Sequence, residues 1–121
     1  VEDRVTLDLR FLPREDLARL VNHASAVAYL PFDEDSPGYV TMEAFQAAKP
    51  VITTTDSGGV LSLVRDGETG WVREPSAEAL AGVFRAVDAA AGSAAALGLQ
   101  GRQALLAMGL TWPATIERLL S

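Results

Sequence analysis

Two short apolar runs, residues 26–30 and residues 51–54, constrain the fold of this chain more than any other feature. Neither run alternates between apolar and polar residues, which is typical of a strand covered on both faces. The connection between them is long enough for a helix, and parallel neighbouring strands require such a crossover, which is nearly always right-handed. The sequence therefore predicts an α/β fold: a partial Rossmann-like parallel sheet with flanking helices and further helices at the C-terminal end.

A further strand and a helix are expected before the first run. Val5, Leu7, Leu9 and Phe11 alternate with polar residues, which predicts a half-buried strand that Pro13 interrupts. The helix that follows has acidic residues in its first turn and apolar residues at helical spacing, namely Glu15, Asp16, Leu17, Leu20, Val21 and Ala24.

Helices, strands and a glycine-rich turn are also expected downstream. In chain order they are a helix over residues 40–48, the turn Asp56-Ser57-Gly58-Gly59, a short helix over 60–64, a strand over 70–72, a long helix N-capped by Ser76, and helices over 99–108 and 112–120. Leu80, Val83, Phe84 and Val87 are predicted to form the buried stripe of the long helix. The alanine-rich residues 89–96 contain Gly92 and Ser93, and we expect a helix break there.

Composition limits the classes of function. The chain has 121 residues, of which 49% are hydrophobic and 21% charged, so we expect one globular domain over residues 1–121. A net charge of −6 argues against nucleic acid as a partner, because no basic face is present to neutralise phosphates. The absence of cysteine excludes disulfides and fits a reducing, cytoplasmic compartment. Because the chain begins at Val1 and few strands are predicted, we expect it to be a piece of a longer protein.

An acidic loop after the first run is the clearest candidate for a functional site. Asp35 and Glu43 are separated by seven residues, and Pro37-Gly38 forms a turn between them that opens a helix. In open α/β sheets, ligands bind beyond the carboxyl ends of the strands, where this loop should lie.

Several motifs occur in a fixed order and carry a resemblance to a known family. They are the acidic loop, Glu43-Ala44-Phe45, residues 49–53 (Lys-Pro-Val-Ile-Thr), Asp56-Ser57-Gly58-Gly59, residues 64–72 (Val-Arg-Asp-Gly-Glu-Thr-Gly-Trp-Val) and Trp112. In this order the chain resembles the C-terminal half of a retaining GT-B glycosyltransferase, and it is most similar to the family 4 group of sugar-nucleotide-dependent enzymes. The resemblance spans nearly the whole chain.

The resemblance implies a function and a set of site residues. It implies a donor-binding lobe that transfers a sugar from a nucleotide-diphosphate sugar to an acceptor hydroxyl with retention, working with an N-terminal lobe of the same protein and without a metal ion or other cofactor. Asp35 would lie near the donor sugar as the catalytic residue, and Glu43 would bind the ribose. The implied substrate-binding set is Asp35, Ser36, Pro37, Gly38, Tyr39, Val40, Glu43, Gly58 and Gly59.

The resemblance also leaves parts of the enzyme outside this chain. The Arg/Lys pair that the family uses to stabilise the departing phosphate has no match here, because Arg4, Arg10 and Arg14 do not fit its motif. We expect that pair, the first elements of this lobe and the acceptor lobe to lie upstream, with membrane association allowed through the missing lobe. The fragment alone is expected to be inactive.

Elementary chemistry supports the same residues. A diphosphate needs hydrogen-bond donors, and a helix beginning near Ser36 would supply free N–H groups with a favourable dipole. Gly38 would let the backbone come close to the ligand, while Pro37 suits the first helical position but removes one donor. Because an ionised carboxylate accepts only, the two oxygens of Glu43 could take both hydroxyls of a ribose diol.

Plainer readings of these residues remain open. Asp35 could cap the helix while Glu43 is merely solvated. Asp33, Glu34 and Asp35 could bind a divalent metal, although three adjacent acids are more often a solvated turn. The only histidine, His23, is expected at a helix end.

Several aromatic residues and glycines could likewise have either a ligand-binding or a purely structural role. Tyr39 could line the nucleotide pocket or belong to the core, and Trp71 and Trp112 are expected to pack hydrophobically. Gly58 and Gly59 could bring amides to a ligand or simply permit a tight turn, and we favour a turn close to the ligand.

Two rival functions remain at the level of the whole chain. A non-catalytic sugar-nucleotide-binding or interaction module of GT-B ancestry would explain three departures from the family pattern, namely Asp35 in place of Glu, Pro37 in place of an aromatic residue, and Ser62 at an often acidic position. A phosphoacceptor receiver domain shares the small α/β architecture. It would, however, carry its acid cluster after the first strand and a lysine after a later one, and this chain does not show that arrangement.

Overall fold

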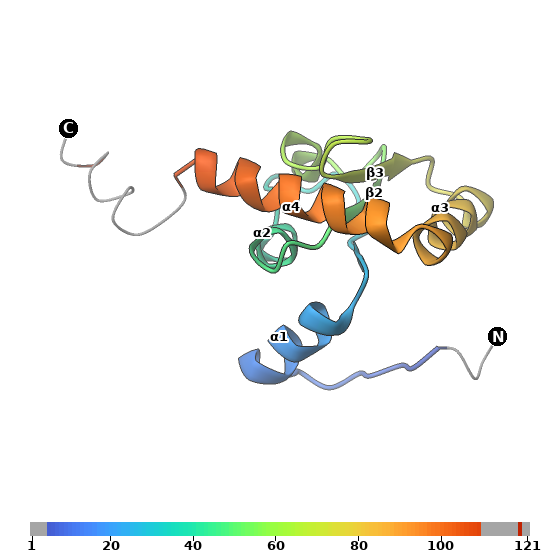
Figure 1. Ribbon diagram of the computed structural model, residues 1–121, viewed down its shortest axis with the longest axis horizontal. Coiled ribbons are helices and arrows are strands. Elements are labelled where there is room, and N and C mark those ends of the chain that lie inside the picture. The colour runs from blue at the N-terminus through green and yellow to red at the C-terminus, as the bar shows by residue number, and fades with distance from the viewer. Residues whose placement is uncertain (1–4, 110–118, 120–121) are drawn as a thin grey trace.

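A three-stranded parallel sheet forms the centre of the molecule (Figure 1). The computed structural model describes residues 5–109 and residue 119. The strands are β1 (Val27–Ala28), β2 (Val51–Thr54) and β3 (Gly70–Arg73), in the spatial order β1-β2-β3 with both pairs parallel. The helices are α1 (Arg14–His23), α2 (Tyr39–Gln46), the 3-10 helix η2 (Gly59–Ser62), α3 (Ala77–Ala89) and α4 (Ala91–Ala107). The predicted α/β fold with a parallel sheet is confirmed.

The two faces of β2 lie in two separate core clusters. Val51 packs with Phe45 of α2 and with the apolar residues around η2. Ile52, on the opposite face, packs with Val83 of α3 and the residues near it. All four residues of β2 are buried, because α4 contributes to both clusters and covers the strand together with α2 and α3. The expectation of a strand covered on both faces is therefore correct for β2.

The same expectation is wrong for the run at residues 26–30. Only Val27 and Ala28 form β1, and Ala28 is exposed. The strand pairs with β2 on one side, through N–H groups that donate to Pro50 and Ile52. Among the described residues no strand pairs with its other side, so β1 is an edge strand and its run is not enclosed.

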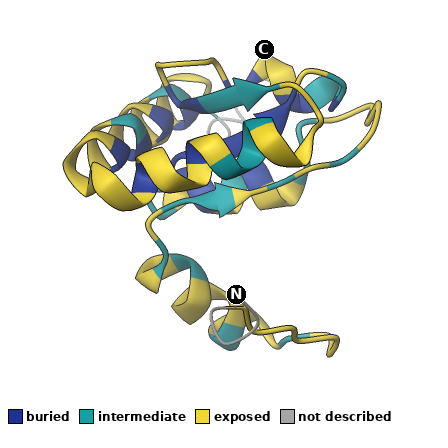
Figure 2. Cartoon of the chain, turned by 90° about the vertical axis from the view of Figure 1, so that its right-hand side faces the viewer, coloured by how far each residue is buried: buried dark blue, intermediate teal, exposed yellow. Residues whose placement is uncertain are grey.

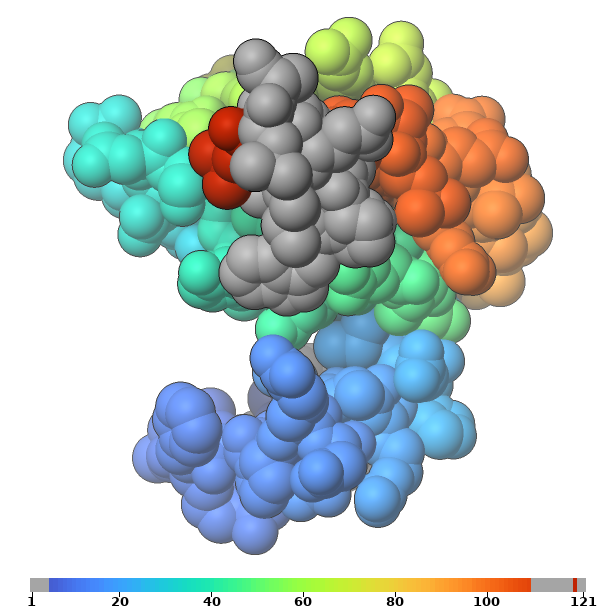
Figure 3. All heavy atoms as spheres, turned by 90° about the vertical axis from the view of Figure 1, so that its left-hand side faces the viewer, coloured from blue at the N-terminus to red at the C-terminus, as the bar shows by residue number. Residues whose placement is uncertain are grey.

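Residues 5–11 do not form the predicted strand. Leu9 is 86% exposed and Phe11 is fully exposed. A strand needs a neighbour to satisfy its backbone N–H and C=O groups, and no described strand pairs with this segment. Helix α1 forms as predicted, but it buries no residue and stands apart from the body, as Figures 2 and 3 show. Its apolar stripe therefore remains largely exposed.

The helices after β3 follow the sequence with two corrections. Ser76 caps α3 as predicted, accepting a hydrogen bond from the Ala79 N–H at 3.2 Å. The predicted stripe is buried at Val83 and Val87, but Phe84 is 47% exposed and belongs to neither core cluster. Helix α4 begins at Ala91 rather than at residue 99, since alanine favours helix strongly enough to include the Gly-Ser pair, and the expected break lies at Ala90 alone.

Smaller differences between the predicted and the observed elements concern the ends of two helices. The helix expected over residues 40–48 runs over Tyr39–Gln46, and the one expected over 60–64 is the 3-10 helix Gly59–Ser62. The helix expected over 112–120 lies outside the described residues apart from Leu119.

No single helix in the described ranges is long and apolar enough to cross a bilayer, although α3 and α4, bent by 101°, pass that test as a pair.

Asp66 fixes the turn between η2 and β3. Its Oδ1 accepts hydrogen bonds from the Val72 N–H at 3.0 Å and from Arg73 Nη1 at 2.7 Å. The Val72 N–H lowers the pKa of the Asp66 carboxyl, burial opposes this effect, and Arg73 adds to the lowering. Asp66 therefore stabilises the fold when it is ionised.

Replacing Asp66 by alanine should give a small, pH-dependent loss of stability. Because the pKa is lower in the folded state, the contribution is present above the unfolded pKa of about 3.9 and is lost as the pH falls through the folded pKa. The Asp66 side chain is 55% exposed, so solvent screening limits the effect to about 1 kcal/mol or less at neutral pH. Urea unfolding should show the gap at neutral pH and not at about pH 2. Glu68→Ala, in the same turn, is the control, and an equal gap at both pH values would contradict the assignment.

Candidate functional site

The acidic loop and the glycine-rich turn are joined by backbone hydrogen bonds. The Asp33 N–H donates to the Asp56 carbonyl at 2.8 Å, and the Glu34 N–H donates to the Ser57 carbonyl at 3.0 Å. In return, the Gly59 N–H donates to the Glu34 carbonyl at 2.6 Å. The pairing of β1 with β2 thus resumes beyond the carboxyl ends of both strands. We call this arrangement of residues 33–36 and 56–59 the loop latch.

Two glycines make the loop latch sterically feasible. A Cβ atom at Gly58 would lie 2.5 Å from the Glu34 carbonyl oxygen, and Gly58 has a positive φ of 85°. A Cβ atom at Gly59 would lie 2.8 Å from the Asp35 carbonyl oxygen. Of the two readings of this pair, the close turn is therefore present. The Gly59 N–H already has an acceptor within the protein.

Helix α2 begins one residue before the predicted range of 40–48, and three residues after Ser36, where free N–H groups were expected. Gly38 is its N-cap, with φ 80° and ψ 147°, and the first helical residue is Tyr39 rather than a residue near Ser36. Pro37 therefore precedes the cap and does not occupy the first helical position. This conformation is almost exclusive to glycine, so the helix cannot start before it.

Gly38 also lies against an aromatic ring. A Cβ atom at Gly38 would lie 2.8 Å from Cε2 of Tyr29, the residue that follows β1. The helix start therefore does not tolerate most residues. A side chain at Gly38 is therefore expected to harm the stability of the fold, because the glycine is required by the backbone and by its packing.

The start of α2 offers free backbone donors at the carboxyl edge of the sheet. Within the described structure the N–H groups of Tyr39, Val40 and Thr41 have no acceptor, as expected for a first helical turn. The dipole of the helix adds a positive potential there. The Thr41 hydroxyl is fully buried and also lacks a partner in the described part of the chain.

The predicted site residues differ in their exposure. Asp35, Ser36 and Glu43 are exposed, and Pro37 and Gly38 are half-buried. Tyr39 is 82% exposed and Val40 is 38% exposed, so Tyr39 does not belong to the core. These side chains are accessible to a ligand.

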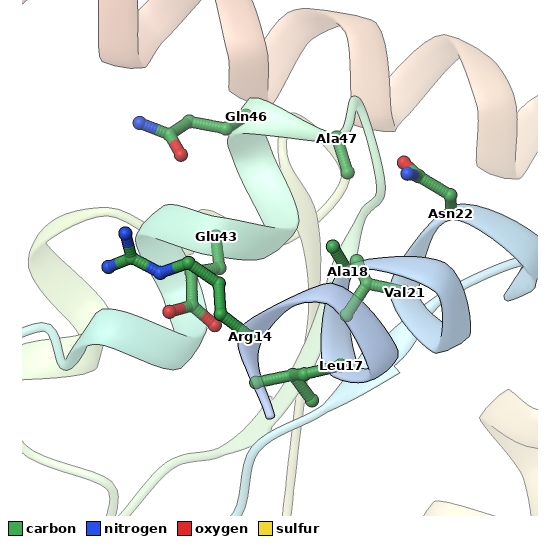
Figure 4. Close-up of a pocket in the computed structure, with 8 residues that line it drawn as sticks. All are labelled: Arg14, Leu17, Ala18, Val21, Asn22, Glu43, Gln46 and Ala47. Atoms are coloured by element: carbon green, nitrogen blue, oxygen red, sulfur yellow. The ribbon is translucent and has the colours of Figure 1, made fainter. Parts of the chain in front are cut away.

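A cavity of about 530 Å³ lies between α1 and α2. Apolar residues form part of its wall and polar residues the rest, and the lining consists of Arg14, Leu17, Ala18, Val21, Asn22, Glu43, Gln46 and Ala47. Figure 4 shows the Arg14 side chain reaching from α1 toward the side of α2 that carries Glu43. No ion pair joins Arg14 and Glu43, although both residues lie within the described ranges. The remaining predicted site residues, at the loop latch and at the start of α2, do not line this cavity.

Arg14 is the residue that the sequence interpretation missed. Arg14 is the first residue of α1, directly after Pro13, so the position of the helix start determines where its side chain lies. Its position after Pro13 and before two acids was visible in the sequence. Only the position of α1 on the opposite side of the cavity from α2 brings it near Glu43.

The other residues considered from the sequence make contacts within the protein or lie outside the described residues. His23 is exposed at the end of α1, as expected, and its Nδ1 donates to the Arg19 carbonyl at 2.8 Å. Trp71 packs against the second core cluster as predicted, whereas Trp112 lies outside the described residues. The Ser62 hydroxyl donates to the Gly59 carbonyl at 2.7 Å. Across the described residues no group of three or more His, Cys, Asp or Glu side chains could hold a metal ion.

Comparisons with known proteins identify a family and a similar fold. The family model described as Glycosyl transferases group 1 matches residues 2–103. Among solved structures, the chain is similar to Anabaena Alr3699/HepE in complex with UDP-glucose, with UDP, and with UDP and glucose, at 23%, 22% and 24% identity and TM-scores of 0.63, 0.67 and 0.66. Each match covers 76% of this chain but only 25% of the HepE chain. No curated protein matches the chain at a significant level.

Proposed function

The chain belongs to the family of glycosyl transferases group 1, with a Rossmann-like lobe of the GT-B fold, and we propose that it is the lobe that binds the nucleotide-sugar donor. One observation carries this proposal: the acid of the loop, the free N–H groups at the start of α2 and the cavity beside Glu43 follow one another along the chain from residue 35 to residue 43. Diphosphate, sugar and nucleoside each require one of these features.

The diphosphate is placed at the start of α2. Two backbone N–H groups without protein acceptors, those of the exposed residues Tyr39 and Val40, point in the direction of the helix N-terminus, where an anion is stabilised by the dipole. The chain has a net charge of −6, so local donors rather than the overall field must hold the anion. Gly38 has no side chain to cover these donors.

The nucleoside is placed in the cavity between α1 and α2. Glu43 is an exposed acceptor on the cavity wall and can take both ribose hydroxyls. The volume of about 530 Å³ is within the range of small-molecule pockets. Arg14, across the cavity, supplies donors to the acceptor groups of a base, while Leu17 and Val21 give it an apolar surface.

The sugar then lies near Asp35, where the reaction takes place. The bond from the anomeric carbon to the diphosphate oxygen breaks, and the departing diphosphate keeps the electron pair. A bond to the acceptor hydroxyl oxygen forms on the same face, with retention, and the acceptor proton passes to the departing diphosphate. Asp35 accepts hydrogen bonds from sugar hydroxyls and orients the ring, which contributes to catalysis by positioning. The start of α2 stabilises the charge that develops on the departing phosphate.

The proposal also includes the position of the lobe in the protein, its independence of a metal ion, its compartment and its donor. The similarity of the motifs supports a C-terminal lobe of the family 4 group that needs no metal ion, acts in the cytoplasm and works with an N-terminal lobe of the same protein. HepE was crystallised with UDP-glucose and UDP, which supports UDP-sugars as the first donors to test. The chain spans a quarter of the HepE length, so the acceptor is to be sought with the complete enzyme.

Replacing Glu43 by glutamine should weaken nucleotide binding while the fold is kept. Losing charge-assisted hydrogen bonds to the ribose costs about 1 to 3 kcal/mol, a Kd increase of roughly five- to 150-fold. Calorimetric titration of the full-length protein with UDP-, GDP- and ADP-sugars should identify one that binds and should show this loss. Glu68→Gln, an exposed acid distant from α2, is the control. Unchanged affinity for Glu43→Gln would remove Glu43 from the site.

A non-catalytic module is the second candidate, favoured by one observation. The Asp35 side chain is one methylene shorter than the glutamate that is usual in the family, and the preceding latch holds its backbone in place. If the shorter acid does not reach the sugar, the protein binds a nucleotide sugar without turnover. Donor binding in calorimetry together with no transfer to any acceptor would support this reading. The family match excludes the receiver-domain reading.

A further inference from the structure

The loop latch connects the proposed catalytic acid to the sheet. The Glu34 carbonyl, directly before Asp35, accepts the hydrogen bond from Gly59 at 2.6 Å, and the Glu34 N–H is bound to Ser57. Both backbone groups of the residue before Asp35 are thus held by the turn after β2. The side chain of Asp35 remains exposed.

Gly59 contacts the backbone that carries Asp35. A Cβ atom there would lie 2.8 Å from the Asp35 carbonyl oxygen and 2.8 Å from the Ser36 carbonyl carbon. These neighbours are backbone atoms and cannot rotate away. Gly59 is not among the glycines with positive φ, so its own conformation is open to other residues. The need for glycine at this position comes from the acidic loop rather than from the turn itself.

A hydroxyl of β2 anchors the other side of the latch. Thr54 Oγ1 donates to Asp56 Oδ1 at 2.7 Å, and Thr54 is 2% exposed. The Asp56 carbonyl in turn accepts from Asp33. Asp35 is therefore tied through two loops to the most buried strand of the sheet.

We propose that Gly59 is a positioning residue for Asp35, with Thr54 as its support: the turn after β2 fixes where the acid meets the donor sugar, and its Gly59 N–H does not bind the ligand. The inference rests on the proposed function. It separates the two parts of the site, because Glu43 lies on α2 and no residue of the latch lines the nucleoside cavity. Disturbing the latch should therefore affect the sugar and not the nucleotide.

Gly59→Ala in the full-length enzyme tests this separation. With UDP-glucose as the first donor probe, and the GDP- and ADP-sugars after it, kcat should fall about tenfold or more, because small misplacements of positioning groups cost up to about a hundredfold. Affinity for the free nucleoside diphosphate should change by less than about twofold. Gly82→Ala is the control, since a Cβ at Gly82 in α3 meets nothing within 4 Å.

A second pair of variants covers the case in which Gly59→Ala does not fold. Thr54→Val keeps the side-chain volume but removes the hydroxyl that holds Asp56, and it should lower kcat by about threefold or more. Thr53→Val is its matched control on the same strand, because the Thr53 hydroxyl is buried without a partner among the described residues, and it should leave kcat unchanged.

Double variants show whether the effect passes through Asp35. In an Asp35→Ala background, Gly59→Ala and Thr54→Val should each lower the residual kcat by less than about twofold, because the positioned group is already gone. Additive losses, unchanged kcat in the active enzyme, or a loss of nucleoside diphosphate affinity would overturn the positioning role while leaving the proposed function intact. If the wild-type enzyme transferred sugar from none of the donors, both would fall.

Discussion

Replacing Asp35 by alanine is expected to lower the kcat of the complete enzyme by about a hundred- to a thousandfold. The expectation follows from its place at the end of the acidic loop, exposed beside the start of α2 and held by the loop latch. Loss of a preorganised polar group at the reacting centre costs about this much in other enzymes. Nucleoside diphosphate affinity should remain close to that of the wild type, because Glu43 and the first turn of α2 are unchanged. Initial rates of sugar transfer at saturating donor measure the effect.

Glu34→Ala is the matched control for Asp35→Ala. Glu34 is the neighbouring exposed acid, and it takes part in the loop latch only through its backbone N–H and carbonyl. Its truncation should leave kcat within about twofold of the wild type, as for most exposed positions. Equal losses in both variants, or an Asp35→Ala enzyme that retains most of its activity, would show that Asp35 has no specific role.

Replacing Gly38 by valine should destabilise the fold by roughly 3 kcal/mol or more. Its φ of 80° and ψ of 147° lie in a region that costs a non-glycine residue about 1–3 kcal/mol, and a β-branched side chain is among the least suited to it. The new side chain would also meet the Tyr29 ring, and overpacking of this kind adds about 1–3 kcal/mol. The free energy of unfolding in urea measures the sum.

Gly67→Val isolates the contribution of the backbone. Gly67 has φ 76° in an exposed turn, and a Cβ there meets nothing within 4 Å. The excess destabilisation of Gly38→Val over Gly67→Val therefore reports on the packing against Tyr29 together with the ψ of 147° at Gly38. Equal destabilisation of the two variants would show that the ring moves aside at no cost.

Elements with many neighbours could be predicted from the sequence. The run Val51–Thr54 forms β2 with the predicted bounds, because both of its faces are covered and its short apolar pattern is typical of a buried strand. Ser76 capped α3 as predicted, since an N-cap depends on residues within one turn. The parallel order of the sheet followed from the lengths of the connections.

Elements that depend on distant partners could not be predicted in the same way. The alternation from Val5 to Phe11 describes a strand, but a strand forms only beside another strand, and none of the described strands pairs with it. The exposure of Phe84 likewise depends on which side of α3 the sheet occupies. Local periodicity contains no information on either point.

The candidate site shows the same division. The sequence indicated the acidic loop, Glu43 and the glycine pair as one region, and the structure places the loop and the pair in direct contact. It gave no sign that the Gly59 N–H would be used by Glu34, or that Arg14 would line the cavity with Glu43. Both depend on how segments separated along the chain approach each other. Free N–H groups were expected near Ser36 but begin at Tyr39, because the positive φ of Gly38 is a property of the folded loop.

A crystal structure of the full-length protein with a bound UDP-sugar, or with whichever nucleotide sugar binds in the calorimetric panel, tests the central claim most directly. We expect the diphosphate at the N–H groups of Tyr39 and Val40, both ribose hydroxyls within about 3 Å of the Glu43 carboxylate, and the sugar beside Asp35. A nucleotide sugar bound elsewhere, with neither the start of α2 nor Glu43 in contact with it, would contradict the account.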